Sequence, residues 1–149
     1  MKEEQVTKNL LQWLISNSWS IVCFDFPQSG TGRILHPDDS ASEKNKSAII
    51  PDIVAVKDGI CLFFENKDRF YYQDFEKQNF LITNNRYENS IAKLLQNYSI
   101  NCILYGIGMP LANYSDKAVT ASSLVDFVVC VSNDTIISVV YNPHGISFV

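Results

Sequence analysis

Three charged side chains stand in a stretch that is otherwise typical of sheet core. Residues 51–67 are PDIVAVKDGICLFFENK, in which Asp52 opens one apolar run while Glu65 and Lys67 end the next. Alternate side chains of a strand share a face, so Glu65 and Lys67 are expected to point the same way. Asp58-Gly59 predicts a tight turn between the two runs. The resulting hairpin would bring Asp52 close to opposite Glu65.

Two carboxylates at adjacent strand ends are a candidate site for a divalent cation. Burying one unpaired carboxylate is costly, and a second beside it adds repulsion. Mg²⁺ takes oxygen ligands and is typically held by one or two carboxylates together with waters and substrate phosphates. Asp52 and Glu65 would supply the carboxylates, the backbone carbonyl of Asn66 could add an oxygen, and Lys67 could position a water or stabilise developing charge. The competing interpretation is a solvated strand end where Lys67 only forms a salt bridge.

The pattern Pro51-Asp52, twelve residues, then Glu65-Asn66-Lys67 resembles the signature of the PD-(D/E)xK nuclease superfamily, which includes many restriction endonucleases. The resemblance implies a core ordered helix, three strands, helix, strand, over about residues 2–108. It implies that Asp52 and Glu65 bind Mg²⁺, with Mn²⁺ as an alternative, and that Lys67 orients or activates the attacking water.

The superfamily often adds a glutamate from its first helix, and this chain offers two. At about 100° per residue, Glu3 lies near the centre of the helix face that carries Val6 and Leu10, and Glu4 points away from it. Glu3 is therefore the better candidate for the catalytic set. For either residue, the alternative is an ordinary acid that stabilises the first helical turn.

The elements that must position these residues follow from periodicity and turn signals. A helix is expected over 2–17, a long loop over 27–47, a second helix over 86–98 and a helix running into a strand over 118–129; residues 68–85 fit a loop or a short helix. Strands are expected over 19–26, 48–56, 60–67, 101–108 and 135–142. The sequence predicts an α/β fold, a mixed sheet flanked by helices, in a single domain over 1–149 with 109–149 as a C-terminal elaboration. The resemblance implies that its core is the restriction-endonuclease-like αβββαβ arrangement.

Composition limits the class of protein. The chain has 12 basic and 16 acidic residues, a net charge of −4, which argues against a surface coated in basic patches. No apolar run approaches the ~18 residues needed to cross a bilayer, and the N-terminus lacks a signal-peptide core, so a cytoplasmic protein is expected. The four cysteines have no paired spacing and are expected to be buried thiols.

Double-stranded DNA is the partner that the resemblance implies. Phosphate or base contacts would come from the loops around the motif. The candidates are Arg33, His36, Lys44, Lys46, Arg69, Tyr71 and Lys77. Cutting both strands of a duplex favours a two-fold homodimer, and the apolar segments 123–131 and 135–142 are candidates for its interface.

A restriction-type endonuclease is favoured over other branches of the superfamily. The Gln-x-x-x-Tyr spacing of one exonuclease branch is absent, because Gln73 is followed by Lys77 and Gln78 by Ile82. A junction resolvase would usually be more basic. The alternative from another class is a catalytically idle nucleic-acid-binding or interaction subunit on a nuclease-like fold.

Overall fold

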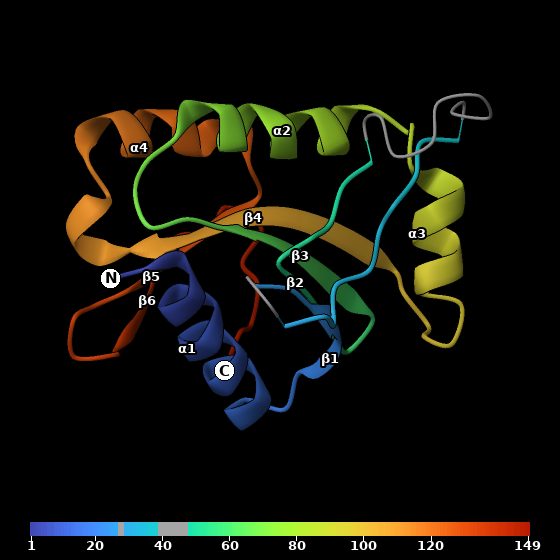
Figure 1. Ribbon diagram of the computed structural model, residues 1–149, viewed down its shortest axis with the longest axis horizontal. Coiled ribbons are helices and arrows are strands. Elements are labelled where there is room, and N and C mark those ends of the chain that lie inside the picture. Colours follow the sequence, from blue (N-terminus) through green and yellow to red (C-terminus); the bar gives the residue numbers. More distant parts are fainter. Residues whose placement is uncertain (27–28, 39–47) are drawn as a thin grey trace.

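The chain forms a six-stranded mixed sheet covered by helices on both faces, as seen in a computed structural model that describes residues 1–26, 29–38 and 48–149 (Figure 1). The strands lie in sequence order across the sheet; β3 pairs parallel with β4, β4 parallel with β5, and the other pairs are antiparallel. They are β1 Ser20–Phe24, β2 Ile53–Lys57, β3 Ile60–Asn66, β4 Cys102–Pro110, β5 Phe127–Val131 and β6 Ile137–Tyr141.

Four α-helices are present among the described residues, and two short 3₁₀ turns flank the last of them in the sequence. They are α1 Glu3–Ser16, α2 Tyr72–Thr83, α3 Glu88–Leu94 and α4 Asp116–Ala121, with 3₁₀ turns at Leu111–Asn113 and Ser122–Leu124. In Figure 1, α1 lies on one face of the sheet, while α2 and α4 lie on the other. The α/β class with helices on both faces is thus as the sequence predicts.

The hairpin of β2 and β3 forms where the sequence predicts it. Asp58 and Gly59 both have positive φ, 51° and 81°, the two-residue turn geometry that suits the twist of antiparallel strands. The register pairs Ile53 with Phe64. One step further from the turn, Asp52 therefore lies opposite Glu65.

Three apolar clusters, one on the α1 face and two on the opposite face, hold the helices to the sheet. On one face α1 buries Val6, Leu10 and Leu14, which recur every fourth residue, against the sheet and the C-terminal Phe148. On the other face α2, α3 and α4 cover the remaining side chains of the strands. Because β3 is buried on both faces, its charged end emerges between α1 and α2.

Several predicted boundaries are wrong. The strand expected over 48–56 begins only at Ile53, because Ile49 instead bridges to Leu35 outside the sheet ladder. The helix expected over 86–98 spans Glu88–Leu94 alone, and the undecided segment 68–85 contains α2. Of the four cysteines, Cys102 is exposed.

The C-terminal elaboration completes the sheet itself. All five residues of β5 are buried between β4 and β6, so the apolar segment 123–131 is explained by the core of this chain. Of the two strands in this C-terminal part, only β6 lies at an edge of the sheet, and its side chains are partly exposed. Among the described residues, no helix combines the length and the apolar character that crossing a membrane requires.

Candidate active site

The three charged residues of the hairpin meet at the end of β3, between α1 and α2. Asp52 and Glu65 are both buried, at 8% and 6% exposed, and Lys67 follows β3 directly. Lys67 Nζ lies 3.7 Å from Glu65 Oε1 and 3.9 Å from Glu3 Oε2. The spacing in the sequence and the register of the hairpin thus bring all three side chains into one cluster.

Asp52 is fixed by the peptide of the neighbouring strand. The Asn66 N–H donates to Asp52 Oδ2 at 2.7 Å, and the Asp52 N–H donates to the Phe64 carbonyl at 3.1 Å. Burial, and next the negative charge of Glu65, raise the pKa of Asp52 to about 8, against the opposing effect of the Asn66 hydrogen bond. This carboxyl is strained electrostatically unless a positive charge or a proton joins it.

Glu65 is neutralised by two lysines from different elements. Besides Lys67, Lys77 of α2 places Nζ 3.1 Å from Glu65 Oε2. The prediction made Lys77 a candidate DNA contact, but its ammonium is engaged inside the cluster. Lys67 is 29% exposed and Lys77 is 39% exposed, so both pairs are screened in part by solvent.

Lys67 stays charged among the acids around it. Burial acts to lower the pKa of Lys67, but Asp74, Glu3 and the two hairpin carboxylates together hold it above its ordinary value. An ammonium in this state donates hydrogen bonds and positive charge and does not act as a base.

The structure separates the two glutamates at the start of α1. Glu3 faces Lys67, and burial raises the pKa of Glu3 despite that cation. Glu4 instead pairs with Lys8 one turn along the helix, at 3.0 Å on the surface. Only Glu3 therefore belongs to the cluster.

Asn66 connects the cluster to α1. Its side chain is fully buried and donates from Nδ2 to Thr7 Oγ1 at 3.1 Å, one turn along α1 from Glu3. A Cβ at Gly108, the β4 partner of Asn66, would collide with Asn66 Oδ1, so glycine leaves the space for this side chain. Asn66 thus contacts Asp52 through its peptide and α1 through its amide.

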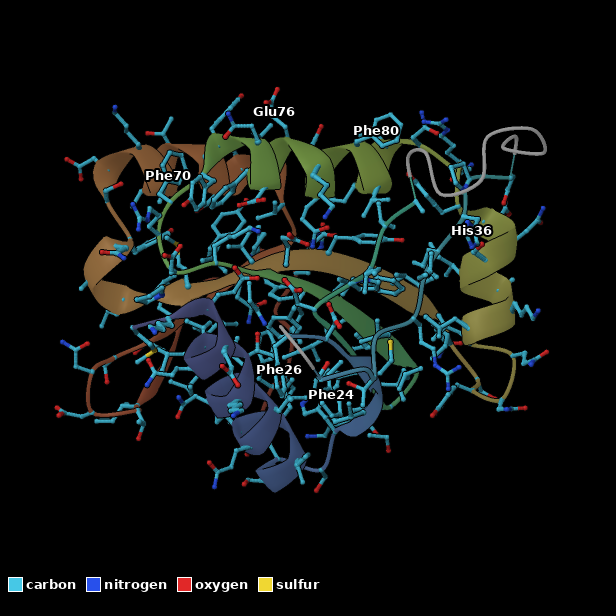
Figure 2. The ribbon with its side chains drawn as sticks, viewed as in Figure 1. Phe24, Phe26, His36, Phe70, Glu76 and Phe80 are labelled. Atoms are coloured by element: carbon cyan, nitrogen blue, oxygen red, sulfur yellow. The ribbon has the colours of Figure 1, made fainter. Side chains whose placement is uncertain are left out.

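Helix α2 adds a carboxylate that the sequence did not reveal. Burial, and next the charge of Glu65, raise the pKa of Asp74 to about 6, and its Oδ2 atom is buried without a hydrogen-bond partner among the described residues. Asp74, Lys77 and Gln78 recur at helical spacing on the side facing the sheet, whereas Figure 2 shows Glu76 on the outer side. This spacing is present in the sequence and could have placed Asp74 in the site. It was not used because residues 68–85 were left open between a loop and a short helix.

Gln78 fixes the position of α2 over the site. Its Nε2 donates to the carbonyls of Phe63 on β3, at 3.2 Å, and Gly106 on β4, at 2.8 Å. The side chain is 3% exposed. Because both acceptors are backbone groups of adjacent strands, the helix is held in register with the strand that carries Glu65.

The candidate DNA contacts that the structure describes come from different parts of the fold. Arg69 and Tyr71 lie exposed just beyond the cluster, and Arg69 pairs with Asp68 at 3.3 Å. Arg33 is exposed beside β1. His36 lies next to α3, where its backbone N–H donates to Ser90 Oγ (Figure 2). Lys44 and Lys46 lie outside the described residues.

The donor set suits a hard cation in an open site. In the part of the chain that the structure describes, no three His, Cys, Asp or Glu side chains are grouped closely enough to hold a metal ion by themselves. Two carboxylates are nevertheless the usual protein share of a Mg²⁺ site, with waters and phosphate oxygens completing it. The buried acids Asp52 and Glu65, with the unpartnered Oδ2 of Asp74 nearby, are compatible with such a site.

Comparison of the chain with protein-family models, with curated proteins and with solved structures found no match in any of the three.

Proposed function

We propose that the chain is a Mg²⁺-dependent DNA endonuclease of the restriction type, acting on double-stranded DNA. The observation that carries the proposal is the buried pair Asp52 and Glu65 at adjacent strand ends, with Lys67 beside them. Two buried acids and a lysine at the end of two adjacent strands are electrostatically costly. Groups with perturbed pKa values of this kind are concentrated at functional sites.

The order of elements supports the same proposal. Helix α1, strands β1 to β3, helix α2 and strand β4 follow the order of the PD-(D/E)xK core, with α3 inserted before β4. The motif residues lie on the antiparallel hairpin of β2 and β3, and β3 pairs parallel with β4. The likeness of architecture is an analogy, so the chemistry is argued from the residues.

The residues have distinct roles in the proposed reaction. Asp52 and Glu65 would hold Mg²⁺, with the Asn66 carbonyl as the further candidate ligand, and the cation when bound would stabilise charge on the phosphate and acidify water. Lys67, held between Glu65 and Glu3, would orient the attacking water and stabilise the phosphate oxygens. Asn66 orients Asp52 through its N–H.

The proposal includes contacts to DNA and a homodimer. Arg69 and Tyr71 are exposed near the cluster and remain the best-placed candidates for contacts to DNA. Of the two segments predicted for a homodimer interface, 135–142 is the available one, because β5 is enclosed while Ile136 and Val139 are 63% and 38% exposed.

One observation favours the second candidate, a catalytically idle binding or interaction subunit. The Lys77 ammonium neutralises Glu65 in place of a metal. In an idle subunit that ion pair would be permanent, and the protein would bind no Mg²⁺.

Digestion of plasmid and phage DNA with Mg²⁺ and with EDTA tests the proposal. We expect Mg²⁺-dependent cleavage that Asp52→Ala abolishes, because the cation loses a ligand. Asp58→Asn is the matched control, since it removes a carboxylate from the turn end of the same hairpin and keeps a residue that tolerates positive φ. Full cleavage by folded Asp52→Ala protein would contradict the proposal; absence of both cleavage and calorimetric Mg²⁺ binding would favour the idle subunit.

A further inference from the structure

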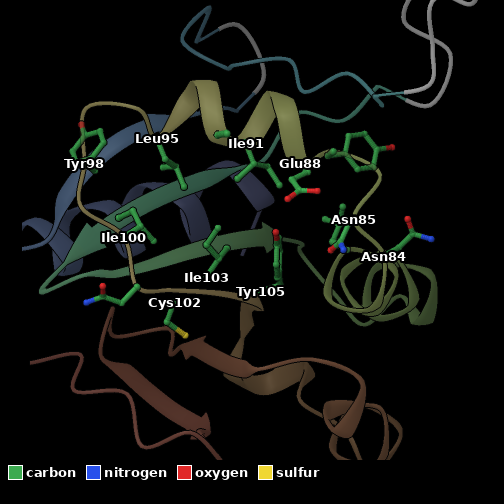
Figure 3. Close-up of a pocket in the computed structure, with 14 residues that line it drawn as sticks. Asn84, Asn85, Glu88, Ile91, Leu95, Tyr98, Ile100, Cys102, Ile103 and Tyr105 are labelled. Carbon is green, nitrogen blue, oxygen red and sulfur yellow. The ribbon is translucent and has the colours of Figure 1, made fainter.

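A second concave site lies at the other end of α2 from the acidic cluster. Its volume is about 540 Å³, within the range of small-molecule pockets, and it opens between β4, α3 and the segment after α2 (Figure 3). Leu81, Ile91, Leu95 and Ile103 form its apolar lining. The amides of the Asn84-Asn85 segment stand at its rim.

Tyr105 gives this pocket a polar group without a partner. The residue is 7% exposed, and its ring packs on Phe63 with centroids 5.0 Å apart. Its hydroxyl forms no hydrogen bond to any residue that the structure describes, and Figure 3 shows the ring rising from β4 toward Asn85 and Glu88. A tyrosine hydroxyl at a pocket wall with no protein partner can donate a hydrogen bond to a ligand or accept one from it.

The charges around the pocket exclude anionic ligands. None of its lining residues is Lys, Arg or His, and the single charged one is Glu88. A phosphate or carboxylate would lose its hydration without gaining a cation. Asn84, Asn85 and Asn101 instead offer amide donors and acceptors together.

We propose that this pocket binds an uncharged planar heterocycle of the nucleobase class. The edge of a base carries donors and acceptors that asparagine amides match, and its faces suit the apolar lining. Tyr98, 39% exposed at the pocket, offers a ring for stacking. The base comes from a free nucleoside or from a nucleic-acid strand whose phosphates stay outside. The proposal goes beyond the nuclease function and does not depend on it.

Fluorescence quenching of 2-aminopurine tests the proposal in EDTA, where cleavage cannot interfere. The probes are 2-aminopurine riboside and a short single-stranded DNA with 2-aminopurine at its centre. Tyr105→Phe keeps the ring on Phe63 and removes the hydroxyl; we expect affinity to fall about three- to tenfold, as for a lost hydrogen bond. Ala92→Trp fills the pocket from an exposed position of α3 and is expected to abolish binding.

Tyr141→Phe on β6 is the matched control and is expected to bind like the wild type. Tighter binding of the oligonucleotide than of the riboside identifies a strand as the source, and binding of the riboside alone identifies a free nucleoside. The proposal is overturned if neither probe is quenched saturably, or if either Tyr105→Phe or Ala92→Trp binds with wild-type affinity.

Discussion

The two ends of α2 present opposite kinds of site on one face of the sheet. At the N-terminal end, Asp74 and Lys77 join the hairpin acids in a cluster where each charge influences the others. At the C-terminal end, about 15 Å along the helix by its rise per residue, the pocket contains Tyr105 and a single charged side chain.

The difference in charge between the two sites shows how one scaffold can select two kinds of ligand. The cluster concentrates charge that only a cation or a proton relieves, so it selects by electrostatics. The pocket lacks cations and offers shape, apolar surface, amides and the Tyr105 hydroxyl, so it selects an uncharged partner. Changes at one end should therefore leave the other end intact, and the predictions below test that independence.

The largest effect is expected from Lys67→Ala. Loss of the ammonium that lies between Glu65 and Glu3 should reduce cleavage by about 10²–10³-fold, the usual cost of removing one electrostatic group from an active site. Binding of 2-aminopurine riboside at the pocket should not change. Lys117→Ala on α4 is the control for loss of a lysine. Near-normal cleavage kinetics would remove Lys67 from the proposed mechanism.

The pH dependence of stability should come from the cluster. The pKa of Asp52 is raised from 3.8 to about 8, so between these values the folded protein holds a proton that the unfolded chain has lost. Stability in EDTA should therefore fall as pH rises through this window. Asp52→Asn cannot ionise, and its melting temperature at pH 8 should exceed that of the wild type by at least about 3 °C, which corresponds to ~1 kcal/mol.

The control for this pH profile comes from the pocket. Tyr105→Phe removes only a group whose pKa is raised to about 12, first by burial, so the melting profile below pH 9 should keep its wild-type shape. Thermal denaturation from pH 4 to pH 9 checks both variants. A flat wild-type profile would show that Asp52 is not under electrostatic strain.

Lys77→Met should strengthen Mg²⁺ binding. The Lys77 ammonium lies 3.1 Å from Glu65 and competes with a cation for it. Removing this partly exposed pair, worth up to about 1 kcal/mol, should lower the Mg²⁺ dissociation constant about two- to fivefold by calorimetry. Lys117→Met should bind Mg²⁺ like the wild type. An unchanged Mg²⁺ dissociation constant in Lys77→Met would show that Glu65 is not a ligand of Mg²⁺.

The smallest effect separates the two glutamates of α1. Glu3→Gln should slow cleavage several-fold, because Glu3 is the one that contacts Lys67. Glu4→Gln removes a surface pair with Lys8 and should change stability by no more than about 0.5 kcal/mol and leave cleavage unaltered. Equal effects of the two substitutions on cleavage rates would refute the assignment of Glu3.

Local signals predicted the hairpin, and longer-range packing explains what they missed. The Asp58-Gly59 turn fixed the register that sets Asp52 opposite Glu65. Helix α2 was left open between a loop and a short helix, because its inward face mixes Phe75 with the polar Asp74 and Gln78. Asp74 faces the charge of Glu65, and Gln78 bonds backbone carbonyls of β3 and β4. The start of β2 was misplaced because the bridge of Ile49 to Leu35 spans a long insertion.

The sequence by itself determined the α/β class, the hairpin, and the convergence of Asp52, Glu65 and Lys67, since alternation and a two-residue turn are local properties of the chain. Helical periodicity already favoured Glu3 over Glu4. Only the tertiary structure decided that Lys77 pairs with Glu65 and that Tyr105 lines a pocket without cationic side chains. These contacts depend on where the helices pack on the two faces of the sheet. That placement follows from the packing of side chains far apart in sequence, which no local pattern encodes.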